Sequence, residues 1–472
     1  MKFKKLISAA LAAAAAAALA AGCSQDTENT GETTSSSSGG KVQISVGAWP
    51  SQNSNETLYN QYMDMKARFE EANPDIEIIP DNWSFSLDTF MAKAAGGALP
   101  TLYEGYYTEA NRIIDAGYCA DLTEYVEKYG YDTKIKEQLM SLVSKDGKYY
   151  AIPKSGYTMG LYLNKNMLEA AGEVNEDGSI KVPDTYQELA EMAGRIREKT
   201  GQAGIAVCTA NGTGGWNFLN IAWSFGTKFM EQDENGKWIA TFDSPECVAA
   251  LQYIKDLKWK YNALLESSFI TGTEQQKFFS ADQAAMFIGT PPQDELVKLY
   301  GMSNEDICIA SLPKGDGGRY AQIGGTISFV NSNATPEQID ACFKWIEFAN
   351  WGYAIDDAAK TAMEEQYQVR AEQGLPIGFY QYSPWTDDTE RSEFEKSVID
   401  ANANIPAENV ESFNNPPEDL QTKPEEPMKC QELYTVLDSC IQEVITNENA
   451  DPAALIKNAQ ETFQKDYLDS AE

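Results

Sequence analysis

Apolar positions between residues 41 and 95 follow two different periods. Residues 41–49 alternate apolar and polar side chains and residues 76–79 form a second short apolar run, so each segment predicts a strand. Between them, apolar side chains recur every three or four residues over 57–72, which predicts an amphipathic helix. A second helix is expected over 87–95, where a glycine pair ends it. This order of elements indicates an α/β fold with largely parallel sheets.

The alternation of strands and helices continues along most of the chain. The predicted helices cover residues 110–116, 122–129, 185–200, 245–261 and 336–348, and the predicted strands cover 149–152, 159–163, 205–208, 284–288 and 323–330. Residues 352–428 are polar and interrupted by prolines, so their elements cannot be assigned from the pattern. Amphipathic helices are expected over 429–445 and 452–467.

The first 22 residues have the pattern of a secretory signal. Three lysines within residues 2–5 precede a small and apolar stretch over 6–21, which is short for a membrane span. The end of this stretch, Leu-Ala-Ala-Gly before Cys23, resembles a bacterial lipoprotein signal, in which the cysteine is lipidated and becomes the new N-terminus. An ordinary secretory signal followed by an unmodified cysteine is the alternative. Residues 23–40 carry almost no apolar side chains, and we expect them to form a disordered tether.

Composition excludes several classes of function. The chain has 71 acidic and 37 basic residues, for a formal net charge of −34, and it has no histidine. The missing histidine excludes a Ser-His-Asp triad, histidine-ligated zinc and a histidine pH switch. The acidic excess argues against nucleic-acid binding, because contacts to phosphates require clustered lysine and arginine.

Other candidate chemistry is interpreted as structural. Seven of the eight cysteines follow Cys23, and this odd number without a CxxC pair predicts small core residues and no disulfide framework. Adjacent acidic pairs arise by chance in so acidic a chain, so none is assigned as a catalytic dyad. Residues 233–236 are interpreted as a turn, because no glutamate follows at the spacing of a calcium loop. We therefore expect no catalytic residue, no metal site and no cofactor.

Six segments in order resemble the extracellular solute-binding proteins of ABC importers, the large family that includes maltose-binding protein. The most specific segment is DGKYYAIPKSGYTMGLYLNKNMLEAAG at residues 146–172. The others are MAKAAGGALPTLYEG, where Thr101 replaces the usual aspartate, then VPDTYQELAEMAGRI, TFDSPECVAALQYIKDL, FFSADQAAMFIGT and LPKGDGGRYAQIGGTISFV. The resemblance runs from Val42 to the C-terminus and is weakest over 352–428.

This resemblance implies a two-lobed periplasmic-binding-protein-like fold, in which each lobe is a mostly parallel sheet flanked by helices. The ligand would sit in the cleft between the lobes, which close by a hinge motion. The family implies that the chain crosses between lobes near residues 154–158, 320–325 and Trp351. The N-terminal lobe would then contain residues 41–155 plus 322–350, and the C-terminal lobe residues 156–321 plus 351–472.

Aromatic side chains that follow predicted strands or flank these crossings are the candidates to line the cleft. Sugar C–H faces stack on aromatic rings, while the hydroxyl groups need acids and amides as partners. The predicted ligand-binding residues are Trp49, Trp83, Glu104, Tyr106, Tyr107, Tyr157, Trp216, Asn217, Gln293, Gly325, Thr326 and Trp351. Packing within a lobe is the alternative for Trp49. Residues 212–215 are glycine-rich but lack the phosphate-loop patterns, and we interpret them as a cleft-lining loop.

The resemblance implies a lipid-anchored extracellular receptor that captures a carbohydrate, an oligosaccharide, and delivers it to the transmembrane subunits of an ABC permease. We expect a monomer on the outer side of the bacterial cell membrane. A peptide or a cationic solute is the alternative ligand, which the acidic excess favours mildly. A secreted glycan-degrading enzyme and an adhesin are alternatives from other classes, although no placed acid–base pair marks an enzyme.

Overall fold

The computed structural model describes residues 40–54 and 56–471. The predicted signal segment 1–22, the lipidation site Cys23 and residues 24–39 of the predicted tether lie outside the described residues. The chain from Lys41 onward forms one compact unit. Among the described residues, no helix is both long enough and apolar enough to cross a membrane.

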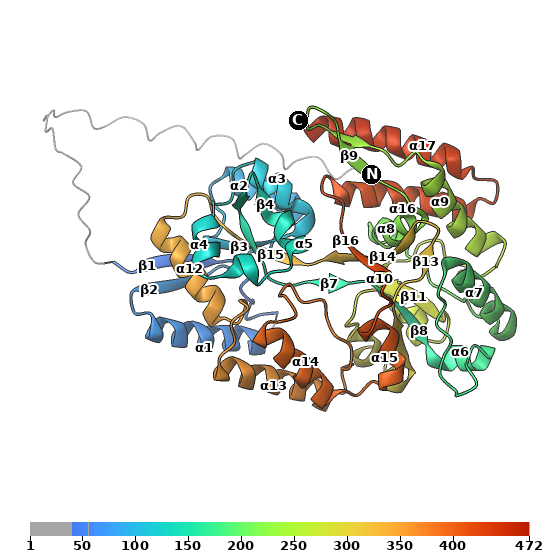
Figure 1. The fold of residues 1–472 in the computed structure, drawn as a ribbon, viewed down its shortest axis with the longest axis horizontal. Coiled ribbons are helices and arrows are strands. Elements are labelled where there is room, and N and C mark those ends of the chain that lie inside the picture. Colours follow the sequence, from blue (N-terminus) through green and yellow to red (C-terminus); the bar gives the residue numbers. More distant parts are fainter. Residues whose placement is uncertain (1–39, 55, 472) are drawn as a thin grey trace, which may run out of the picture. The chain divides into compact units, whose positions relative to one another are not determined.

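The first sheet has five strands in the spatial order β2–β1–β3–β15–β6. Figure 1 labels β1, β2, β3 and β15 of this sheet. β1 is parallel to β2 and β3, whereas β15 runs antiparallel to β3 and β6, so the sheet is mixed. The strands are β1 (Val42–Val46), β2 (Ile76–Pro80), β3 (Leu102–Tyr106), β6 (Ala151–Pro153) and β15 (Thr326–Val330).

Helices cover this sheet and share one hydrophobic core with it, called core A here. Helix α12 (Pro336–Phe348) begins with a capping box between Thr335 and Gln338, and its Trp345 is fully buried against Phe69 of α1. The other helices of core A are α1 (Glu56–Ala72), α2 (Leu87–Ala95), α3 (Ala110–Asp115), α4 (Thr123–Lys128) and α5 (Glu137–Met140). The helices predicted over 57–72, 87–95 and 336–348 are confirmed to within one residue.

The second sheet is antiparallel, which corrects the expectation of a mostly parallel sheet in each lobe. Strand β8 (Gly160–Asn164) lies between β11 (Met286–Gly289) and β12 (Ile307–Ala310) and is antiparallel to both. All five positions of β8 are buried. A fully buried strand reads as a continuous apolar run whatever the direction of its neighbours, so the sequence pattern could not distinguish the two arrangements.

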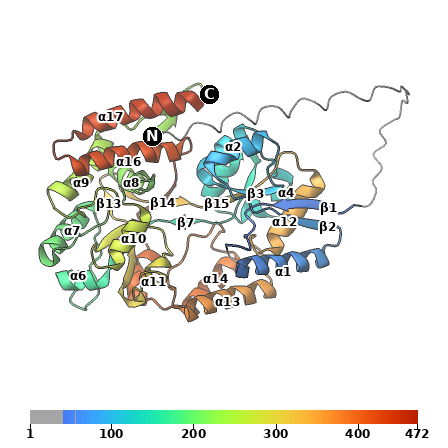
Figure 2. The ribbon, with the colours of Figure 1, turned by 180° about the vertical axis from the view of Figure 1, so that it is seen from behind.

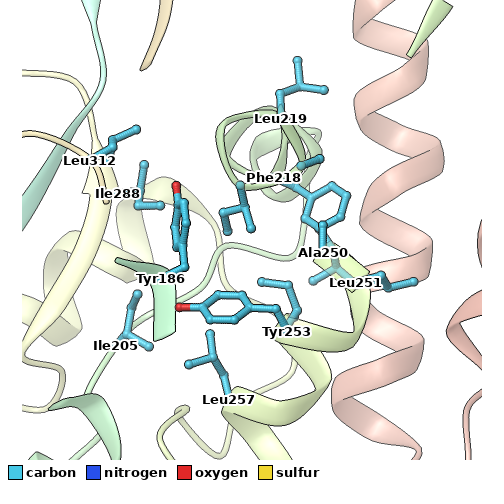
Figure 3. Packing of buried hydrophobic residues seen from close by; sticks show 14 of the residues in the cluster. Tyr186, Ile205, Phe218, Leu219, Ala250, Leu251, Tyr253, Leu257, Ile288 and Leu312 are labelled. Carbon is cyan, nitrogen blue, oxygen red and sulfur yellow. The ribbon is translucent and has the colours of Figure 1, made fainter. Parts of the chain in front are cut away.

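A second core, core B, forms where helices pack on this sheet. Tyr186 of α7 (Tyr186–Thr200) contacts Tyr253 of α9 (Pro245–Trp259) edge to face, with ring centroids 5.5 Å apart (Figure 3). Leu251 and Leu257 of α9 face the same cluster and are at most 1% exposed. The helices of core B are α6 (Lys165–Ala171), α7, α8 (Thr213–Phe225), α9, α16 (Cys430–Thr446) and α17 (Pro452–Phe463).

A third sheet connects the two cores. Strand β14 (Gly318–Gly324) pairs with β13 (Lys314–Gly315), with β16 (Leu420–Pro424) and with β7 (Tyr157–Thr158). The single strand predicted over 323–330 is therefore two strands, β14 and β15, which belong to different sheets (Figure 2). They are separated at Gly325, whose φ of +150° is a conformation that other residues rarely adopt.

Residues 352–428, which the sequence pattern left unassigned, contain strand β16 and three helices: α13 (Asp357–Glu372), α14 (Glu390–Asn402) and α15 (Ala407–Asn414). Arg370 of α13 makes a bidentate ion pair with Asp294, at 2.6 and 2.9 Å. Trp385, from the same segment, is 2% exposed and belongs to core A, where it packs on Tyr131. The segment thus contacts both halves of the molecule.

Helix α8 occupies the stretch that was interpreted as a glycine-rich loop, and that interpretation is wrong from residue 213 onward. Gly214 and Gly215 lie inside the helix because α16 packs directly against their backbone. A Cβ on Gly215 would lie 2.3 Å from the carbonyl oxygen of Tyr434. The carboxylate of Asp438, also on α16, accepts hydrogen bonds from the backbone N–H groups of Gly212 (2.6 Å) and Gly215 (2.7 Å). An acidic side chain from another helix therefore caps the N-terminus of α8.

The strand predicted over 205–208 is also wrong. This backbone makes only single hydrogen bonds to its neighbours, such as Ala206 N–H to the carbonyl of Met286 at 2.9 Å, and no ladder forms. The seven cysteines among the described residues are buried and unpaired, which confirms their interpretation as core residues. The remaining elements are α10 (Gly272–Ser280), α11 (Glu295–Lys298), β4 (Ser144–Lys145), β5 (Lys148–Tyr149), β9 (Met230–Gln232), β10 (Trp238–Ala240) and short turns at 107–109, 131–133, 141–143, 304–306 and 464–471.

Two glycine substitutions test the packing of α8 on α16. Gly215→Ala places a methyl group into the backbone of α16, so we expect the free energy of unfolding to fall by about 2 kcal/mol or more. Gly272→Ala, in α10, meets nothing closer than 3.8 Å and should leave stability unchanged or slightly higher. Urea unfolding monitored by circular dichroism measures both variants, and equal stability of the two would contradict the close contact.

Candidate functional site

A pocket of about 450 Å³ opens where the connecting strands meet α8 and α16. Its size lies in the range of small-molecule sites. The wall draws on residues that are far apart in the sequence and that come from both sides of the connecting sheet. The lining residues are Tyr106, Ser155, Tyr157, Asn211, Gly212, Thr213, Trp216, Gly325, Thr326, Glu425, Gln431 and Tyr434.

The carboxylate of Glu425 is held among aromatic side chains in this pocket. Its Oε1 accepts a hydrogen bond from the indole N–H of Trp216 at 3.2 Å and another from the hydroxyl of Tyr434 at 2.6 Å. The ring of Tyr157 meets the ring of Trp216 edge to face, with centroids 5.9 Å apart. Three aromatic rings thus surround one charged acceptor, which is the combination that a hydroxylated ligand with apolar faces requires.

Burial raises the pKa of Glu425 to about 7, from an ordinary value of 4.5. Hydrogen bonds from Tyr434, Trp216 and Tyr157 favour the ionised form and lower this pKa, while the negative charge of Glu109 raises it. Desolvation is the larger effect, so the pocket holds a carboxylate that changes its charge near neutral pH.

The two crossing segments contact each other at the floor of the pocket. The hydroxyl oxygens of Ser155 and Thr326 lie 2.7 Å apart, and the backbone N–H of Ser155 donates to the carbonyl of Thr326 at 3.2 Å. A Cβ on Gly325 would lie 2.1 Å from the carbonyl oxygen of Ser155. Only glycine permits this approach, so the backbone itself forms part of the pocket wall there.

Five of the residues predicted from sequence line this pocket, namely Tyr106, Tyr157, Trp216, Gly325 and Thr326. Tyr106 is 41% exposed and its ring contacts the ring of Phe85, with centroids 5.1 Å apart. Whether these residues bind a ligand stays a prediction.

Glu104 and Trp351 lie next to each other, outside the pocket lining. The carboxylate of Glu104 forms an ion pair with Lys154, whose ammonium nitrogen lies 3.4 Å from the centroid of the Trp351 ring. Burial lowers the pKa of Lys154, and the charge of Glu104 opposes that effect. At the first crossing, the ammonium group of Lys154 is therefore held by both the Glu104 carboxylate and the Trp351 ring.

The structure places Trp49 and Trp83 away from the pocket lining. Trp49 is 3% exposed in core A and stacks on Trp345 at a centroid distance of 5.8 Å. This is the lobe-packing arrangement that the sequence left as the alternative. Trp83 packs near Phe90, and the ammonium of Lys93 lies 5.2 Å from the centroid of its ring.

Tyr107, Asn217 and Gln293 are likewise outside the pocket lining. Tyr107 is 5% exposed, and its hydroxyl lies 3.5 Å from the carbonyl oxygen of Ser155, behind the crossing. Asn217 faces away from the pocket on α8, with its amide donating to the carbonyl of Ile288 at 3.2 Å. Helical geometry explains this, because consecutive helix residues point in directions about 100° apart. The side-chain amide of Gln293 donates a hydrogen bond to the backbone carbonyl of Thr290, three residues earlier, at 2.6 Å.

Sequence reasoning missed Glu425, Gln431 and Tyr434, which all come from the last part of the chain. Glu425 and Glu426 are flanked by Pro424 and Pro427, directly after β16. A proline on each side disfavours a helix, so the pattern alone predicts a non-helical segment for this acidic pair. That pattern indicates a turn, but it does not show which side chains the acidic pair meets.

Among the described residues, no group of three or more cysteine, aspartate or glutamate side chains is arranged to hold a metal ion. The turn at Asp233 is closed by its own carboxylate, which accepts from the backbone N–H groups of Asn235 and Lys237 at 2.8 and 2.9 Å.

A sequence profile described as bacterial extracellular solute-binding protein matches residues 53–353, more than half of the chain. The chain belongs to this family. Among individual solute-binding proteins, it is similar to the maltodextrin-binding protein MdxE of Bacillus subtilis, with 23% identity over 319 residues, which cover 66% of this chain and 70% of that relative. It is also 27% identical to the arabinooligosaccharide-binding protein of the same organism over 209 residues, or 42% of this chain and 44% of that relative.

Solved structures show the same fold. An ABC substrate-binding protein from Listeria monocytogenes in complex with cycloalternan matches with a TM-score of 0.64 at 18% identity, over 90% of this chain and 99% of that one. The maltose-bound MalE3 of T. maritima matches with a TM-score of 0.61 at 22% identity, with the same coverage. The predicted two-lobed fold of solute-binding proteins is therefore confirmed, with the mixed and antiparallel sheets described above.

The raised pKa of Glu425 predicts how stability depends on pH. Its carboxyl group binds its proton more tightly in the folded protein than in the unfolded chain, so the contribution of Glu425 to stability falls as the pH rises from about 4.5 to about 7. Glu425→Gln removes this titration but keeps an amide oxygen for Trp216 and Tyr434. We expect the variant to lose less stability than the wild type between pH 5 and pH 8, by on the order of 2 kcal/mol.

Urea unfolding midpoints at pH 5 and pH 8 measure this difference. Glu448→Gln removes one carboxylate from an exposed turn and controls for the change in net charge. Identical pH dependence in the wild type and Glu425→Gln would show that Glu425 does not carry the effect.

Proposed function

We propose that this chain is the receptor of an ABC importer, which captures a carbohydrate, specifically an oligosaccharide, and delivers it unchanged to the permease. The observation that carries this proposal is the pocket wall of Tyr157, Trp216 and Tyr434 around the carboxylate of Glu425. Aromatic rings can stack on the C–H faces of a sugar, and the carboxylate can accept hydrogen bonds from its hydroxyl groups. The names of the relatives, which bind maltodextrin and arabinooligosaccharides, support the same ligand class.

The capture mechanism would be closure of two lobes on the ligand. We propose lobes of residues 41–155 plus 322–350 and of residues 156–321 plus 351–472. Cores A and B support the division, although Trp385 of the second range packs in core A. A ligand that contacts both lobes only when they are closed shifts the population toward the closed form, which the permease could then recognise.

The receptor would be a monomer attached to the outer face of the bacterial membrane through a lipid on Cys23, with residues 24–40 as the tether. The support for this is the sequence of the signal segment. The relatives that the family match brings together are binding proteins, and we propose that this chain likewise has no enzymatic activity.

A peptide or a cationic solute is the second candidate ligand, and one observation favours it. Glu425 offers a negative charge inside a pocket with aromatic walls, and such a site also suits an ammonium group. Binding of a cation would weaken strongly with salt, whereas hydrogen bonding to neutral hydroxyl groups would change little.

Titration calorimetry of the chain against a ligand panel tests the proposal. The panel contains maltotetraose, arabinotriose, xylotriose, cellotriose, spermidine and a basic tripeptide. For the sugar that binds, Trp216→Ala should weaken binding by about 1–3 kcal/mol through loss of stacking. Trp216→Phe keeps a ring but loses the N–H donor to Glu425, so it should lose less affinity.

Phe269→Ala is the matched control, because Phe269 is 56% exposed and lies outside the pocket lining. It should bind like the wild type. Salt-sensitive binding of spermidine or the peptide, without heat from any sugar, would replace the carbohydrate assignment by the second candidate. Release of reducing sugar during the incubations would instead identify an enzyme, and a scattering curve that no ligand changes would favour an adhesin.

Cell fractionation tests the anchor. In a bacterium that expresses the full chain, Cys23→Ser should move the protein from the membrane fraction to the medium or periplasm, because the lipid attachment is lost. Metabolic labelling with radioactive palmitate should mark the wild type and not the variant. A Cys119→Ser variant is the control, since Cys119 is buried. Membrane association that survives Cys23→Ser would contradict lipid anchoring at this residue.

A further inference from the structure

The pocket carries one formal charge, and that charge is negative. Glu425 is the charged member of its twelve lining residues, and none of the twelve is lysine or arginine. The other polar members, such as Asn211, Thr213 and Gln431, are neutral. An acidic ligand group would therefore meet an unbalanced carboxylate.

Basic side chains near the pocket, within the described ranges, are already paired. Lys154, next to the lining residue Ser155, is bound to Glu104. Arg112 pairs with Glu109 at 3.2 Å, and Lys429 pairs with Glu432 at 3.4 Å. Each cation is thus offset by its own acid, and none supplies a balancing charge to Glu425.

We infer that Glu425 determines which sugars the pocket accepts: neutral oligosaccharides, or sugars that carry an amine, bind there, and sugars that carry a carboxylate are excluded. This inference rests on the proposed carbohydrate function and narrows its ligand class.

Hydrogen bonding is a second reason, besides the negative charge of Glu425, to expect that sugars carrying a carboxylate are excluded. A carboxylate can only accept hydrogen bonds, and Oε1 of Glu425 already receives two, from Trp216 and Tyr434. A sugar hydroxyl or ammonium group can donate to it. The carboxylate of a uronic acid cannot donate, and in a partly buried site two like charges repel more strongly than they do in water.

The exclusion should depend on pH, because the charge of Glu425 depends on it. The titratable groups that face Glu425 are Tyr157 on β7, Tyr434 and Cys430 on α16, and the more distant Glu109. Burial raises the pKa of Cys430 and of both tyrosines well above neutral, so these three stay uncharged at pH 5.5 to 8.5. Across that range Glu425 itself changes from mostly neutral to mostly ionised.

The test takes the neutral oligosaccharide of the panel that binds most tightly and oxidises its primary hydroxyl groups to carboxylates. If all of its residues lack a primary hydroxyl, the corresponding uronic-acid-substituted oligosaccharide is used. Calorimetry then compares the neutral and acidic sugars on the wild-type chain and on Glu425→Gln. At pH 8.5 we expect the acidic sugar to bind the wild type at least tenfold more weakly than the neutral sugar does. This difference in affinity between the two sugars should be several-fold smaller in Glu425→Gln.

A second measurement needs no variant and covers the case in which Glu425→Gln fails to fold. On the wild type, the gap between neutral and acidic sugar should be larger at pH 8.5 than at pH 5.5. Equal affinity for both sugars at pH 8.5, or a gap that neither the substitution nor the pH changes, would overturn the inference while leaving the receptor function standing. If no neutral sugar binds, the carbohydrate assignment fails and the inference fails with it.

Discussion

The close contact between α8 and α16 is the constraint on which the candidate site depends. Two consecutive glycines let the backbones of these helices meet, and Asp438 ties the start of α8 to α16. As a result, Trp216 and Tyr434, which are 218 positions apart, both reach the same carboxylate oxygen of Glu425. A side chain at Gly215 would push the two helices apart, and the two donors could no longer meet at one acceptor. A side chain at Gly214 would clash with the carboxylate of Asp438 and the carbonyl of Cys208.

Local signals explain which parts of the fold could be predicted from the sequence. Helix α12 has its proline at the first position, its capping box and its apolar face within residues 335–348, so its limits were predicted correctly. Helix α8 has no such signals. Its glycines are required by the close packing of α16, not by the conformation of α8 itself. Glycine in a sequence indicates a loop unless the partner that requires it is known, and that partner lies more than 200 residues later.

The same difference between local signals and contacts from distant residues explains which site residues could be predicted. Tyr157 and Gly325 were identified because the family resemblance located the crossings, and backbone crossings stay at the same positions in a fold. Trp49 was chosen for its place after a strand, but a large aromatic side chain there can equally fill the core, and it stacks on Trp345. Glu425 was missed because nothing in its own segment shows that a tryptophan and a tyrosine from other helices donate to it.

The contacts at the crossings limit how the two cores can move relative to each other. Ser155 and Thr326 bind each other through both side chains and backbone, so the two connecting segments must turn together. Trp385 is buried in core A, while Arg370 of the same segment is held by Asp294, which directly precedes α11. A rotation about the crossings changes the distance between those two attachments, so it must bend the segment between them or break the ion pair.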